Sequence, residues 1–122
     1  MARIFVIDDQ ASVRGAIRAI LSAAGHAVEE ASDGSEAMER LNADYDLVIT
    51  DVLMPVMDGF EVVRRVKHLR RDLPVLAITA GLQDDSLDLL ELARKLGADR
   101  TLSKSLIGTQ LAATVGEMLG GG

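Results

Sequence analysis

The segment I-F-V-I-D-D, residues 4–9, places four consecutive apolar residues directly before two adjacent acids. A short continuous apolar run is typical of a strand that is covered on both faces. Asp8 and Asp9 repel each other, and neither carboxylate is easily buried unless a cation compensates its charge. The segment therefore predicts a buried strand that ends in a polar site.

The same alternation between short apolar runs and helical apolar spacing continues along the chain. We predict strands at about residues 4–7, 27–31, 45–50, 74–78 and 100–103. Apolar spacing predicts helices within about residues 13–24, 34–43, 62–69, 89–96 and 107–119. Parallel strands need long right-handed returns, so five strand–helix repeats predict an α/β fold with a doubly wound five-stranded parallel sheet, flavodoxin-like (βα)5.

Composition limits the possible classes of protein. The 122 residues suffice for one domain, which we expect to span 1–119, with 120–122 as a glycine tail or the start of a linker. The absence of cysteine excludes disulfides and thiolate metal sites. A net charge of -6 argues against binding of nucleic acid by this domain, and no segment has the apolar length of a membrane span. We expect a cytoplasmic protein.

Polar residues gather where the predicted strands end, and open parallel sheets bind ligands at that carboxyl edge. The first strand leaves Asp8 and Asp9 there, and later strands leave Asp51, Thr79 and Lys104. Three carboxylates and one ammonium should attract a hard divalent cation such as Mg²⁺. With a metal beside a hydroxyl and an ammonium, one carboxylate could accept a phosphoryl group as an aspartyl phosphate.

Four segments together resemble the response-regulator receiver domains of two-component signalling, the CheY-like family. They are I-D-D at 7–9, T-D-V-L-M-P-V-M-D-G at 50–59, I-T-A at 78–80 and G-A-D-R-T-L-S-K at 97–104. The resemblance implies strand order 2-1-3-4-5 and a phosphorylatable switch that catalyses only its own phosphotransfer and dephosphorylation. The implied partners are a histidine kinase or histidine phosphotransfer protein, a downstream target or attached effector domain, and a second copy in a phosphorylation-dependent dimer.

The resemblance also assigns roles to individual residues. Asp51 would accept the phosphoryl group, while Asp9, Asp51 and the carbonyl of Leu53 would bind Mg²⁺ directly. Asp8 would act on the metal mainly through a bridging water. The residues that would contact the phosphoryl group are Thr79, Ala80 and Lys104. Independently of the resemblance, Gly59 is expected to serve the backbone geometry at the start of a helix and to have no chemical role.

Two positions depart from the family pattern. Thr101 stands where the family usually has Tyr or Phe, and Ser105 stands where it usually has a proline joined by a cis bond. Neither change removes a group from the phosphorylation site, and either geometry stays open for the Lys104–Ser105 bond. We expect the switch to use Thr79, Thr101 and Gly81, and an output face formed by Leu82, Leu87, Leu90 and Ser105.

Two other functions fit part of the pattern. A degenerate receiver used only for docking would explain Thr101 and Ser105, but the complete acid set and Lys104 argue against it. A metal-dependent phosphatase normally has a second carboxylate two residues after its nucleophile, where this chain has Leu53. His26 and His68 do not lie at the predicted carboxyl edge, so both are expected to be solvated.

Overall fold

The computed structural model describes residues 1–52, 59–79, 91, 93–95 and 97–120. All of its strands pair in parallel and form one sheet in the order β2-β1-β3-β4-β5. Their bounds are β1 Arg3–Ile7, β2 Ala27–Ala31, β3 Leu47–Asp51, β4 Val75–Thr79 and β5 Arg100–Ser103. The predicted fold class and the strand order are confirmed.

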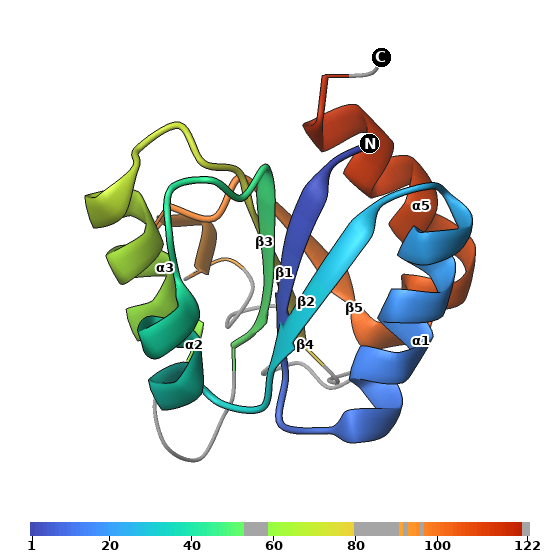
Figure 1. The fold of residues 1–122 in the computed structure, drawn as a ribbon, viewed down its shortest axis with the longest axis horizontal. Helices are drawn as coiled ribbons and strands as arrows, with labels where there is room; N and C mark the ends of the chain where they lie inside the picture. Colours follow the sequence, from blue (N-terminus) through green and yellow to red (C-terminus); the bar gives the residue numbers. More distant parts are fainter. Residues whose placement is uncertain (53–58, 80–90, 92, 96, 121–122) are drawn as a thin grey trace.

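Helices cover both faces of this sheet. In Figure 1, α2 (Gly34–Arg40) and α3 (Gly59–Leu69) lie on one side of the strands, and α1 (Ala11–Ala23) and α5 (Ile107–Met118) lie on the other. A short 3₁₀ helix, η1 (Lys104–Leu106), joins β5 to α5, and residues 91 and 93–95 are also helical. No helix in the described part of the chain combines the length and apolarity needed to cross a membrane.

Alternation along the strands divides the core into two clusters. From β1, Phe5 and Ile7 join the cluster beneath α2 and α3, whereas Ile4 and Val6 join the cluster beneath α1 and α5. All four side chains are fully buried. Burial on both faces explains why this strand is apolar at every position from 4 to 7 rather than at alternate positions.

The second helix is shorter than predicted: it ends at Arg40, whereas the sequence predicted an end at residue 43. Leu41 is already extended, with φ -63° and ψ 130°. The side-chain oxygen of Asn42 accepts a hydrogen bond from the N–H of Asp44 at 2.9 Å. Such a local turn competes with continuation of the helix.

Two further predictions differ from the structure. The third strand starts at Leu47 rather than at residue 45, since the N–H of Arg3 on β1 donates to the side-chain oxygen Oδ2 of Asp46 at 2.7 Å instead of to a main-chain carbonyl. The expectation that His26 is solvated is wrong, since it is half-buried and its Nδ1 accepts the N–H of Ala2 at 3.2 Å. His68 is exposed, as expected.

Candidate functional site

The sheet topology brings the three predicted acids together. Asp8 and Asp9 follow the last residue of β1, and Asp51 is the last residue of the adjacent strand β3. One carboxylate oxygen from each of the three lies within 4.8 Å of the others. Asp8 and Asp51 are buried, with 0% and 4% exposure, whereas Asp9 is exposed. The cluster is therefore open to solvent on the side of Asp9.

Lys104 supplies the cation that compensates the two buried acids. It follows β5 directly, and its ammonium donates hydrogen bonds to Asp51 Oδ2 at 2.9 Å and to Gln10 Oε1 at 3.0 Å. Its Nζ also lies 2.8 Å from Asp8 Oδ2. Burial lowers the pKa of Lys104, but Asp8 and Asp51 outweigh that effect and leave the pKa raised above its ordinary value. Lys104 is therefore a permanent cation at neutral pH.

One oxygen of Asp8 retains capacity for a further ligand. Asp8 Oδ1 accepts the N–H of Gln10 at 2.8 Å. Asp8 Oδ2 is buried and receives no aligned hydrogen bond from the described residues, although the Lys104 ammonium is in ionic contact with it. A buried carboxylate oxygen that contacts one ammonium and lies next to two more carboxylates fits a hard cation such as Mg²⁺.

The predicted hydroxyl lies beside this cluster. Thr79 is 1% exposed and ends β4, one residue beyond Ile78, which is the register partner of Asp51. Thr101 is half-buried on β5 and pairs in register with Ala77, two residues before Thr79. Thr79 is therefore at the carboxyl edge, whereas Thr101 lies further back along the sheet.

Of the remaining predicted site residues, Ser105 belongs to the part of the chain that the structure describes, and the others do not. Ser105 is exposed, its Oγ lies 3.0 Å from Ser103 Oγ, and the bond that joins it to Lys104 is trans. The following predicted site residues lie outside the described residues: Leu53, Ala80, Gly81, Leu82, Leu87 and Leu90.

Gly59 allows α3 to begin directly against the end of β3. Its N–H donates to the carbonyl oxygen of Val52 at 3.1 Å. A Cβ atom at this position would lie 1.9 Å from the main-chain oxygen of Asp51. The prediction that Gly59 serves backbone geometry is confirmed, and the reason is a close approach to the proposed phosphorylation residue.

Gln10 is a further residue of the site that the sequence did not predict: its side-chain oxygen accepts a hydrogen bond from Lys104, and its N–H donates to Asp8. Gln10 occupies the N-cap position of α1 without a side-chain capping bond. Glutamine is not among the favoured N-cap residues. A glutamine at a predicted helix start, directly after the acid pair, could therefore have indicated that Gln10 belongs to the site.

Comparisons with known proteins agree with this geometry. Residues 4–116 match the family described as response regulator receiver domain. The chain is 39% identical over 118 residues to the response regulator MprA of Mycolicibacterium vanbaalenii, covering 96% of this chain and 50% of that protein. The chain thus spans about half the length of the curated relatives it matches.

Solved structures show the same similarity. A response regulator receiver domain protein of Clostridium thermocellum superimposes with a TM-score of 0.88 at 28% identity, over 98% of this chain and 95% of that one. The Thermotoga maritima response regulator TrrA, solved in complex with Mg²⁺-BeF, superimposes with a TM-score of 0.81 at 30% identity, over 97% of this chain and 99% of that one. This chain belongs to the response-regulator receiver-domain family.

Proposed function

We propose that this receiver domain is a Mg²⁺-dependent switch that accepts a phosphoryl group on Asp51 from a histidine kinase or a histidine phosphotransfer protein. The observation that carries the proposal is the placement of Asp51 within the acid cluster, with its Oδ2 2.9 Å from the Lys104 ammonium. Family membership and the Mg²⁺-BeF complex of the relative TrrA support it.

In the proposed transfer, a carboxylate oxygen of Asp51 attacks the phosphorus of a phosphohistidine. A P–O bond forms as the P–N bond breaks, and the imidazole nitrogen leaves with the electron pair of that bond. The Lys104 ammonium and the Thr79 hydroxyl would bind phosphoryl oxygens, as would the main chain at Ala80. When bound by Asp9, Asp51 and the Leu53 carbonyl, Mg²⁺ would supply positive charge to those oxygens.

Two further parts of the proposal concern the role of Asp8 and the reactions that the domain catalyses by itself. Asp8 is held by Lys104 and by the Gln10 N–H, and would act on the metal through water rather than directly. We propose that the domain also phosphorylates itself from small acyl phosphates and slowly hydrolyses the product, which are its only catalytic activities.

The wider role follows from the family. We propose that residues 1–119 form the receiver unit, that it works in the cytoplasm, where the phosphoryl groups of histidine kinases are delivered, and that residues 120–122 form a tail or the start of a linker. Phosphorylation would alter binding to a target protein or an attached effector domain, or formation of a dimer. The switch would involve Thr79, Gly81 and Thr101.

Incubation with Mg²⁺ and a small acyl phosphate, followed by intact-mass measurement, tests the proposal. We expect one phosphoryl adduct that depends on Mg²⁺ and disappears in Asp51→Asn. Asp44→Asn is the matched control, because it changes an exposed aspartate outside the acid cluster. An adduct that persists in Asp51→Asn, or none in the wild type, would contradict the proposal.

A further inference from the structure

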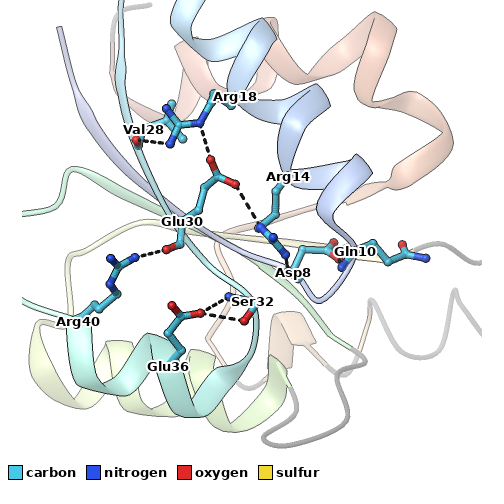
Figure 2. Close-up of polar contacts among 9 residues, drawn as sticks. All are labelled: Asp8, Gln10, Arg14, Arg18, Val28, Glu30, Ser32, Glu36 and Arg40. Carbon is cyan, nitrogen blue, oxygen red and sulfur yellow. Dashed lines mark hydrogen bonds and ion pairs between the residues drawn. The ribbon is translucent and has the colours of Figure 1, made fainter.

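An arginine of α1 holds the main chain between the two adjacent acids. Arg14 Nη1 donates a hydrogen bond of 2.6 Å to the carbonyl oxygen of Asp8, which belongs to the peptide unit joining Asp8 to Asp9 (Figure 2). On the other side, the N–H of Asp8 donates to the carbonyl oxygen of Ala31, the last residue of β2, at 3.2 Å. The backbone at the acid pair is thus fastened to α1 and β2.

Glu30 on β2 holds this arginine in place. Arg14 Nε donates to Glu30 Oε1 at 3.1 Å, and the Arg14 side chain is only 18% exposed. The other carboxylate oxygen of Glu30 accepts from Arg18, which also donates to the Val28 carbonyl at 3.1 Å. Figure 2 shows that Arg14 and Arg18 approach Glu30 from α1, while Arg40 of α2 donates to its main-chain oxygen.

Asp9 needs such a backbone anchor more than Asp8 does. The Asp8 carboxylate is held by Lys104 and by the Gln10 N–H. The Asp9 side chain is exposed and has no hydrogen bond or ion pair with any of the described residues. The direction of its carboxylate therefore depends on the orientation of the preceding peptide unit, which Arg14 holds.

We infer that Arg14 is a positioning residue for the metal site: by fixing the Asp8–Asp9 peptide unit, it directs the Asp9 carboxylate toward Asp51. This inference rests on the proposed function. Groups beyond the direct ligands commonly orient metal ligands in this way. Because the guanidinium of Arg14 is paired with Glu30, which it shares with Arg18, Arg14 repels Mg²⁺ less than an unpaired cation would while it fixes the backbone.

The sign of the effect in Arg14→Met separates positioning from simple electrostatics. Coulomb's law alone predicts tighter Mg²⁺ binding, because a nearby positive charge is removed. Positioning predicts the opposite, about tenfold weaker binding, because the Asp9 ligand loses its orientation. A variant with a lower unfolding temperature but with unchanged Mg²⁺ affinity in its folded molecules would indicate that Arg14 has only a structural role.

Arg18→Met is the matched control. It removes the same charge from the same helix and a bond to the same Glu30 carboxylate, but the described bonds of Arg18 run to Glu30 and Val28 rather than to Asp8. We expect its Mg²⁺ affinity to stay within about twofold of the wild type, because an exposed charge is largely screened. Arg14→Lys keeps the charge but cannot bridge two acceptors as a guanidinium does, so it should also bind Mg²⁺ more weakly.

Mg²⁺ titration followed by the amide NMR signals of residues 8–10 measures each affinity, with thermal unfolding to establish that each variant is folded. Weaker binding in Arg14→Met and Arg14→Lys, but not in Arg18→Met, would support the inference. Equal or tighter binding in a folded Arg14 variant would overturn it and leave the proposed function intact. If Arg14→Met does not fold, Arg14→Lys decides. A wild type that does not bind Mg²⁺ would overturn both.

Discussion

Asp8 and Asp9 are adjacent in the chain but occupy opposite environments. Asp8 is fully buried, and Lys104 compensates its charge, whereas Asp9 is exposed at the open side of the cluster. One lysine faces three carboxylates whose oxygens lie within 4.8 Å of one another. Without a metal, part of this repulsion remains, so the site stores electrostatic free energy that a divalent cation would relieve.

This repulsion predicts the behaviour of Asp9→Ala. The variant should gain about 1 kcal/mol of unfolding free energy in metal-free solution, because one of the clustered charges is removed. The unfolding temperature should rise by about 3–5 °C. Mg²⁺ should raise the unfolding temperature of the wild type but not of the variant, since a ligand stabilises only the state that binds it.

Thermal unfolding with and without Mg²⁺ measures both effects. Asp44→Ala is the control, because it removes an exposed aspartate outside the cluster and should retain the response to Mg²⁺. Stabilisation of Asp9→Ala by Mg²⁺ to the same extent as the wild type would show that Asp9 is not a ligand.

Tyr45 allows a pH prediction, because it is the only tyrosine and the chain lacks tryptophan. Burial raises its pKa above 10, and the hydrogen bond of 3.0 Å that its hydroxyl donates to Glu29 raises it further. A raised pKa means that this group stabilises the fold below pH 10 and that the contribution is lost as pH rises through the folded-state pKa. Phenolate absorbance should therefore show a midpoint above 10 in the native protein, and a midpoint at or below 10 would contradict this account.

Among the elements, the contact between β3 and α3 places Asp51. The helix begins at Gly59 against the last residues of the strand, where a Cβ would lie 1.9 Å from the Asp51 carbonyl oxygen and 2.5 Å from the Val52 Cα. Backbone atoms cannot move aside as flexible side chains do. The absence of a side chain at position 59 is therefore a condition for this packing.

Gly59→Ala should consequently destabilise the fold by about 1–3 kcal/mol or more, because strand and helix must separate. Gly15→Ala is the matched control, since Gly15 is exposed within α1 and has nothing within 4 Å of an added Cβ. It should stabilise the protein by about 0.5–1 kcal/mol through helix propensity. Chemical denaturation measures both, and equal stability of the two variants would refute the close-packing argument.

For the whole molecule, the alternating pattern of the sequence was sufficient to predict the sheet and its carboxyl edge. Strands 27–31 and 100–103 were predicted with their observed bounds. The acid cluster could also be predicted, because the carboxyl ends of parallel strands all lie at the same edge of a sheet. Periodicity does not encode contacts between side chains distant in sequence, so the bonds from Lys104 to Gln10 and from Arg14 to Glu30 were not predicted.

The output of the proposed switch also depends on contacts between distant side chains, which the periodicity of the sequence does not encode. In the proposed switch, the Thr79 hydroxyl would move toward the phosphoryl group, and an aromatic ring on β5 would fill the space that it leaves. Thr101 is half-buried on β5 and has no ring, so we predict that β5 hardly changes on activation. We predict instead that residues 81–90, which include Leu82, Leu87 and Leu90, respond. Hydrogen exchange with and without beryllofluoride tests this, and protection changes confined to β5 would contradict it.

The most direct measurement identifies the residue that carries the phosphoryl group. Borohydride reduces an aspartyl phosphate to homoserine, which peptide mass spectrometry locates in the sequence. After treatment with Mg²⁺ and an acyl phosphate, we predict homoserine at position 51 and at no other aspartate. Homoserine at Asp8 or Asp9, or a labelled protein that contains no homoserine, would contradict the assignment of Asp51 as the phosphoryl acceptor.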